Sequence, residues 1–239
     1  MEFDSKIIIN NNLSMTIESE IKRLSKYFSK SVHQLPGAYL VDEYNMLELE
    51  WRGIKQSTDV KNEIKRALNK TLSAKTLVKL NSVINKLNDI AASKVEDSFT
   101  KSVRVNILDK TSKYIQENNL INCAIIIEYD QDPKKIFVGI SNKSNTDVYQ
   151  AFNNDLDLSP YLGIIHDKNW NDLMNIFEET LVCDELFIYE LSYLVELCAY
   201  KKIIQALRKL KGFTEKYYPL HTEIHIGQHD CEKFIYIVE

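Results

Sequence analysis

The sequence predicts an α+β protein: a helix-rich N-terminal half with a β-hairpin, then a C-terminal half in which a mostly antiparallel sheet packs against long helices. Gly and Pro are scarce, at six and four of the 239 residues, so helices are rarely interrupted. Several segments space their apolar residues three and four apart, as amphipathic helices do. Pairs of β-branched segments flank turn-forming residues, which is typical of hairpins.

Composition narrows the class of protein. Hydrophobic residues make up 44% of the chain and charged residues 27%, values typical of a globular rather than a disordered protein. The four cysteines lie far apart without a Cys-x-x-Cys pair, so we expect reduced thiols. The first residues lack the features of a signal peptide, and no apolar run reaches the roughly 20 residues that a bilayer requires. We expect a soluble, cytoplasmic protein without a membrane partner.

The N-terminal half begins with an amphipathic helix for which Ser14 or Thr16 offers an N-cap. After a Pro-Gly turn, alternating apolar residues between 38 and 51 predict a hairpin, and a helical segment follows from Ser57 to Leu68. The stripe of the first helix consists of Ile17, Ile21, Leu24 and Phe28.

A longer apolar stripe occupies residues 77–91, where the spacing alternates between three and four. This predicts a packed amphipathic helix capped near Ser73, and it leaves open a homodimer through residues 77–91. The pattern loosens between Ala92 and Thr100, which predicts a helix-rich region at 1–95 and an α+β domain at 96–239, unless the two form one continuous domain. The stripe consists of Leu77, Leu80, Ile84, Leu87 and Ala91.

The C-terminal half alternates helices and hairpins. One hairpin is predicted at 123–140 around the turn Asp-Gln-Asp-Pro, and another at 221–238 around Gly-Gln-His-Asp. Helical spacing resumes at Val103 and ends at Asn118-Asn119. A short strand is expected at 161–165, a helix capped by Asp167 follows, and a more apolar helix extends from Asp184 to about Leu210.

The clearest candidate site is a cluster of histidines near the C-terminus. On a strand, His221, Glu223 and His225 would share one face, and imidazole and carboxylate groups are ligands that a catalytic zinc ion recruits. The favoured interpretation is a solvated strand face, because Thr222, Ile224 and Ile226 occupy the opposite face. A pH-sensitive or partner-contacting surface is a third interpretation. No cofactor is expected unless these residues bind zinc.

A second set of charged residues lies on the first hairpin: Asp42, Glu48, Glu50 and Arg52. Some metal-dependent nucleases place an Asp on one strand and Glu-x-Lys on the next, where the carboxylates hold the cation. Here Arg52 stands in the Lys position, and Arg cannot readily give up a proton. The favoured interpretation is surface charge alternating with core residues. No nucleophile or phosphate-binding motif occurs, so the catalytic residues are unknown.

Charge favours a protein partner. Thirty basic and 34 acidic residues give a net charge of −4, so nucleic-acid binding is not expected. We expect a protein-binding factor, such as an inhibitor or immunity-type protein that masks a basic partner, rather than an enzyme. Tyr217 and Tyr218, ahead of a Pro, are the candidate exposed aromatics. The alternative is a metal-dependent hydrolase or nuclease using the C-terminal histidines or the carboxylates of the first hairpin.

Overall fold

A computed structural model describes residues 13–29, 73–129, 136–142, 148–152, 163–164, 166–178, 182–219, 221–228 and 234–238. The hairpin expected at 38–51 lies outside the described residues, and so does the helix expected at 57–68. The predictions for Asp42, Glu48, Glu50 and Arg52 therefore stay predictions.

The chain groups into two compact units, and neither is a continuous stretch of sequence. The sheet unit comprises residues 1–19, 91–162 and 196–239, and the helical unit comprises residues 20–90 and 163–195. The division into 1–95 and 96–239 expected from the sequence remains a prediction.

The sheet unit contains a five-stranded sheet in the order β3-β2-β1-β4-β5, which confirms the α+β class. β1 (Cys123–Tyr129) pairs antiparallel with β2 (Ile136–Asn142), and β4 (Glu223–Gln228) pairs antiparallel with β5 (Phe234–Ile237). These pairs correspond to the two predicted hairpins. β1 and β4 are parallel, and the edge strand β3 (Val148–Phe152) was not predicted.

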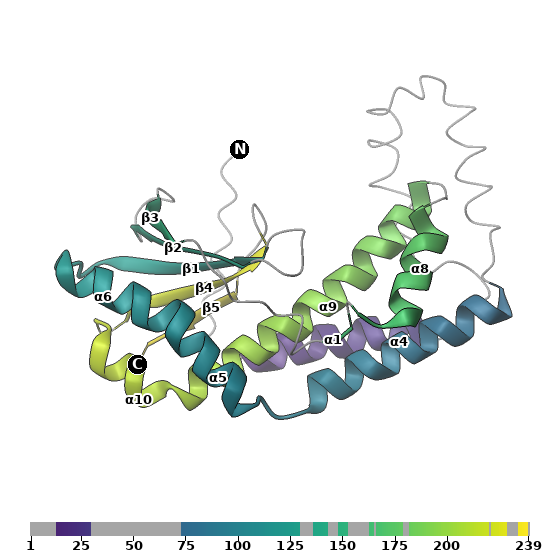
Figure 1. Cartoon of the computed structure of the whole chain (residues 1–239), viewed down its shortest axis with the longest axis horizontal. Coiled ribbons are helices and arrows are strands. Elements are labelled where there is room, and N and C mark those ends of the chain that lie inside the picture. Colours follow the sequence, from purple (N-terminus) through teal and green to yellow (C-terminus); the bar gives the residue numbers. More distant parts are fainter. Residues whose placement is uncertain are drawn as a thin grey trace, which may run out of the picture. The chain divides into compact units, whose positions relative to one another are not determined.

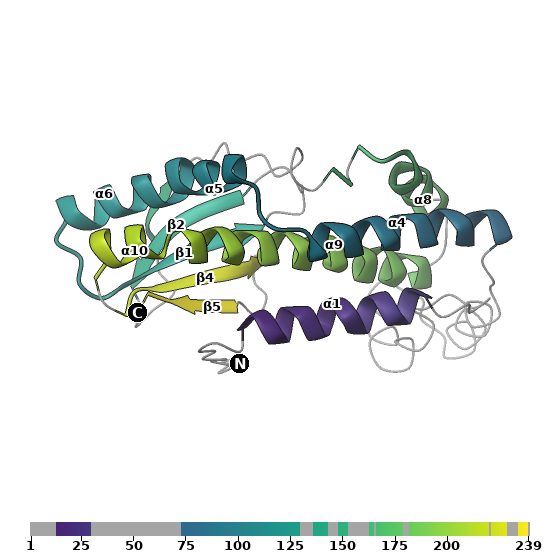
Figure 2. The same cartoon turned by 90° about the horizontal axis from the view of Figure 1, so that it is seen from below.

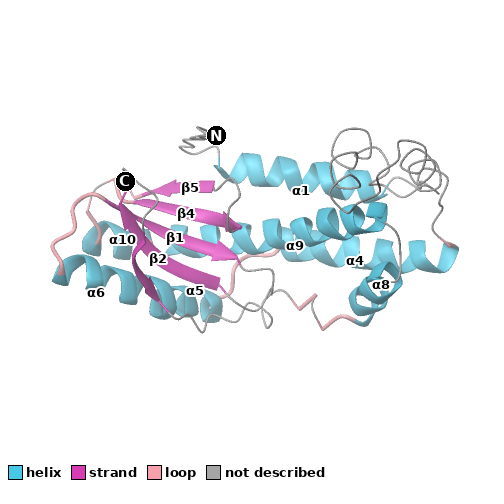
Figure 3. Ribbon diagram, turned by 90° about the horizontal axis from the view of Figure 1, so that it is seen from above, coloured by secondary structure: helices cyan, strands magenta, loops and turns pink. Residues whose placement is uncertain are grey.

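Helices cover one face of this sheet (Figures 1, 2 and 3). They are α5 (Asp97–Val103), α6 (Asp109–Glu117), α10 (Lys211–Tyr217) and the second half of α9 (Val182–Lys209). The core between sheet and helices is formed by apolar β1 and β4 residues at alternate positions, each at most 1% exposed: Ile125, Ile127, Ile224 and Ile226.

A π-helical turn, η2 (Arg104–Leu108), joins α5 to α6, so residues 97–117 form one helical run. The run ends where the sequence predicts: Asn118 is the C-cap and Asn119 has a φ of 52°. Asn tolerates this left-handed conformation better than most residues do. α10, which follows α9 directly, was not predicted.

The helical unit holds all but the last two residues of α4 (Ala74–Ala92), α8 (Lys168–Glu178), the first half of α9 and the larger part of α1 (Leu13–Ser29). α1 begins before either predicted cap. The predicted caps at Ser73 and Asp167 are confirmed: Ser73 Oγ accepts from the Thr76 N–H at 3.1 Å, and Asp167 Oδ1 accepts from the Asn169 N–H at 2.8 Å. α9 begins before the predicted start at Asp184.

The apolar stripe of α4 is buried within a single chain, since Leu80, Ile84 and Leu87 are at most 2% exposed. The homodimer that the sequence leaves open through residues 77–91 stays a prediction, since these three residues are buried whereas Val78 is 69% exposed. Of the strand expected at 161–165, residues 163 and 164 are described and lie outside any strand, because Gly163 has a φ of 58°. No helix in the described ranges is long and apolar enough to cross a membrane.

Candidate functional site

The predicted zinc ligands divide into a pair and a separate residue. His221 lies in a turn before β4 with a φ of 64°, so the alternation of a strand does not extend to it. Glu223 and His225 lie on β4, with His225 Nε2 2.9 Å from a Glu223 carboxylate oxygen. Within the described part of the chain, no three His, Cys, Asp or Glu side chains are grouped so as to hold a metal ion. The geometry therefore gives the zinc prediction no support.

The two predicted partner-binding tyrosines lie in different environments. Tyr218 is 5% exposed, and its hydroxyl donates to the Leu108 carbonyl at 2.8 Å and lies 2.7 Å from Thr111 Oγ1. Burial raises the pKa of Tyr218 above its ordinary value of 10.0. The expectation that Tyr218 is an exposed aromatic is therefore wrong, whereas Tyr217 is only partly buried.

Tyr217 belongs to a surface group that we call the cation–aromatic cluster: Arg104, Phe213, Lys216 and Tyr217. The ring centroids of Phe213 and Tyr217 are 4.6 Å apart with an interplanar angle of 39°. The Arg104 guanidinium carbon lies 4.8 Å from the Phe213 centroid, and Lys216 Nζ lies 4.9 Å from the Tyr217 centroid. Each cation–ring contact of this kind stabilises an exposed site by roughly 0.5–1 kcal/mol.

Two further contacts involve residues of the cluster. Gln116 Nε2 donates to the Tyr217 carbonyl at 3.3 Å, which ties the end of α10 to α6. Arg104 Nε lies 3.6 Å from Asp109 Oδ1, a long and exposed ion pair that contributes little. The Arg104 side chain keeps 51% of its surface exposed, so its charge faces solvent.

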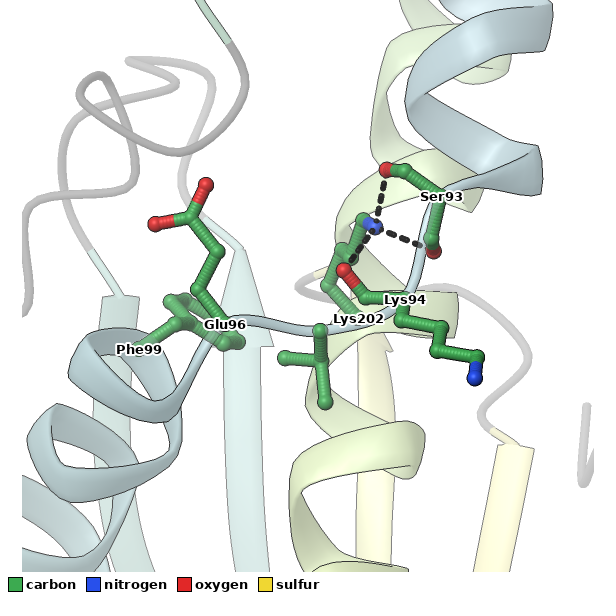
Figure 4. Close-up of a pocket in the computed structure, with 6 residues that line it drawn as sticks. Ser93, Lys94, Glu96, Phe99 and Lys202 are labelled. Carbon is green, nitrogen blue, oxygen red and sulfur yellow. Dashed lines mark hydrogen bonds between the residues drawn. The ribbon is translucent and has the colours of Figure 1, made fainter.

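A small pocket lies where the chain leaves α4 and enters α5 (Figure 4). Its volume is about 30 Å³, which leaves room for about one water molecule. The pocket is too small for an organic substrate. Its lining residues are Ser93, Lys94, Val95, Glu96, Phe99 and Lys202.

Lys202 uses its ammonium group to bind the segment that follows α4. Its Nζ donates to the Ser93 carbonyl at 2.6 Å and to Ser93 Oγ at 2.7 Å, and it lies 3.5 Å from the Lys94 carbonyl (Figure 4). Further along α9, Lys209 Nζ donates to the Val95 carbonyl at 2.8 Å and to Asp97 Oδ1 at 3.0 Å. Burial lowers the pKa of Lys202. These contacts fit a structural role, because a lysine commonly binds the last carbonyls of a helix.

Two other titratable groups are buried on α9. Burial raises the pKa of Glu196 above 4.5, and the hydrogen bond from the Tyr200 hydroxyl at 3.1 Å opposes this change. Burial raises the pKa of the Cys198 thiol to about 12, so it stays protonated at neutral pH and is a poor nucleophile. By contrast, the cation–aromatic cluster presents exposed cations beside two partly buried rings, an arrangement suited to binding.

Sequence reasoning identified one member of the cluster and missed three. The Phe213–Tyr217 spacing of four residues, beside Lys216, is a visible signal for a helical surface pair once α10 is recognised. Arg104 carries no such signal, because its contact with Phe213 depends on how the helices pack.

Comparison with known proteins found no relative: no protein-family model, no curated protein and no solved structure matches this chain.

Proposed function

We propose that the chain is a protein-binding factor that contacts its partner through the cation–aromatic cluster. One observation carries the proposal: Arg104 lies over the Phe213 ring, which contacts the Tyr217 ring, and about half of the Arg104 side chain is exposed. Arginine and aromatic residues are the types enriched at binding hot spots. The mode of action, masking of a partner's surface in the cytoplasm as an inhibitor or immunity-type protein does, belongs to the same proposal.

The partner has an acidic surface. The net charge of −4 suggested a basic partner, but Arg104 and Lys216 give the cluster the opposite sign. Carboxylates of a partner complement these two cations, and its apolar side chains complement the edges of the Phe213 and Tyr217 rings. The arginine supports the same choice, since its planar guanidinium can bind a carboxylate with two parallel hydrogen bonds.

The geometry favours a protein over a single-stranded nucleic acid. Bases bind to proteins by stacking on open aromatic faces. Here Arg104 lies over the Phe213 ring, Lys216 lies over the Tyr217 ring, and the two rings contact each other. The ring faces are therefore already in use, while the outer sides of the two cations face solvent.

Photo-crosslinking in the native cells tests this proposal. A photoreactive residue at position 216 is expected to crosslink a protein at a peptide rich in Asp and Glu. The crosslink should disappear when Arg104→Ala is added. The matched control places the same residue at position 113, because Lys113 lies on α6 with 75% of its side chain exposed and is not part of the cluster.

Three outcomes would count against the proposal. They are a crosslink to nucleic acid, the same proteins crosslinked from positions 216 and 113, and a crosslinked peptide without acidic residues. The masking mode has its own test, in which the identified partner is assayed with and without the purified chain. Unchanged activity at saturating concentrations would contradict it.

A further inference from the structure

The π-helical turn lies directly beside the cation–aromatic cluster. Its hydrogen-bond signature is the Asp109 N–H, which donates to the Arg104 carbonyl five residues earlier, whereas an α-helix bonds residues four apart. Arg104 is both the first residue of the turn and the cation over Phe213. Single π-turns inside α-helices occur frequently at functional sites.

The spacing of the buried residues explains why a wider turn forms here. Five residues of the helical run repeat every four positions and are each at most 2% exposed: Phe99, Val103, Ile107, Thr111 and Ile115. An α-helix rotates about 100° per residue, so this repeat drifts about 40° per step and about 160° over the series. One extra residue in a turn removes about 100° of that drift, which returns the series to one face of the helix.

Two buried hydroxyls bind carbonyls at the end of the turn. Thr111 Oγ1 donates to the Ile107 carbonyl at 2.8 Å, Tyr218 donates to the Leu108 carbonyl at 2.8 Å, and the two hydroxyl oxygens are 2.7 Å apart. Ser112 is a further hydrogen-bond partner of the Tyr218 hydroxyl, and Thr111 Oγ1 also lies 3.4 Å from the Leu108 carbonyl. The Thr111 and Tyr218 hydroxyls therefore meet at the Leu108 carbonyl and form one connected group.

We propose that Thr111 and Tyr218 are positioning residues, which hold the π-turn open and thereby place Arg104 over Phe213. The Gln116–Tyr217 and Thr111–Tyr218 contacts tie the end of α10 to α6, so Phe213 keeps a fixed position relative to α6. If the π-turn became regular α-helix, the residues before the turn would rotate by about 100° relative to α6 and Phe213. Arg104 would then leave the Phe213 ring.

The position of Arg104 over the Phe213 ring can be measured without a partner, although its role in binding rests on the proposed function. A ring beneath a guanidinium shifts the NMR signals of the Arg104 δ-methylene protons upfield. We expect Tyr218→Phe and Thr111→Val each to abolish this shift and to speed amide exchange at Asp109 about tenfold. Thr111→Ser keeps the hydroxyl and should retain both. Tyr114→Phe is the matched control on α6.

The outcomes separate the two proposals. An upfield Arg104 signal that persists in folded Tyr218→Phe and Thr111→Val overturns the positioning role, whatever the partner data show. Loss of the upfield shift in Tyr114→Phe as well also overturns the positioning role, because any change on α6 would then abolish the shift. Loss of the shift in Tyr218→Phe and Thr111→Val alone supports the positioning role. If binding to a partner is nevertheless unchanged in those two variants, the result counts against the proposed function instead.

Discussion

Replacing Lys202 by Met is expected to destabilise the sheet unit by about 1–2 kcal/mol. Methionine keeps the apolar stem but removes the donor to the Ser93 carbonyl and Ser93 Oγ, which lie 2.6 and 2.7 Å away. A hydrogen bond from a charged group contributes about 1.5–3 kcal/mol. The stabilisation from these two bonds is partly offset for two reasons. Burial of the ammonium is unfavourable, as the lowered pKa of Lys202 indicates. Water can also reach the exposed Ser93 and replace the lost donor.

Urea unfolding followed by circular dichroism measures this difference, which corresponds to a fall in Tm of about 2–8 °C. Lys113→Met is the matched control: its ammonium lies 3.8 Å from Glu117 and is exposed, so the loss should stay below about 0.5 kcal/mol. Ser93→Ala removes only the hydroxyl acceptor and should fall between the two. Equal stability of Lys202→Met and Lys113→Met would refute this reasoning.

Two further predictions concern pH. Burial raises the pKa of Glu196 above 4.5, so its folded form keeps the proton in a pH range where the unfolded form has lost it, and stability falls as pH rises through that range. Glu196→Gln should therefore raise the urea midpoint near neutral pH but leave it unchanged below about pH 4, and a lower midpoint at neutral pH would contradict this. The hydrogen bond from Lys86 at 2.9 Å, with the capping bonds, lowers the pKa of Asp167 below 3.8. Asp167→Ala should cost about 1–2 kcal/mol at neutral pH, an effect that shrinks as pH falls below 3.8; a cost independent of pH would exclude the charge as its source.

Local spacing predicted most described helices. The apolar stripes of α1 and α4 and the caps at Ser73 and Asp167 were visible because residues a few positions apart produce them. The π-turn leaves a local signal as well, in the repeat of exactly four residues from Phe99 to Ile115. Only the drift of that repeat distinguishes it from an ordinary α-helical stripe.

Features that depend on distant contacts could not be predicted. The parallel pairing of β1 with β4 places Ile126 opposite His225, and nothing near either residue encodes it. Tyr217 and Tyr218 are adjacent in the sequence, but the end of α10 leaves one ring at the surface and turns the other toward Leu108. A period of two places His221 on the strand, whereas its positive φ is a property of the turn that precedes the strand.

The affinity for the crosslinked partner tests the central claim most directly. Isothermal titration would compare the unmodified chain with Arg104→Ala, Tyr217→Ala and the control Lys113→Ala. Because truncation at a hot spot typically weakens binding by more than 1 kcal/mol, both cluster variants should raise Kd about five- to tenfold or more, while the control stays within about twofold. Cluster variants that bind as tightly as the control would show that the partner is recognised elsewhere on the chain.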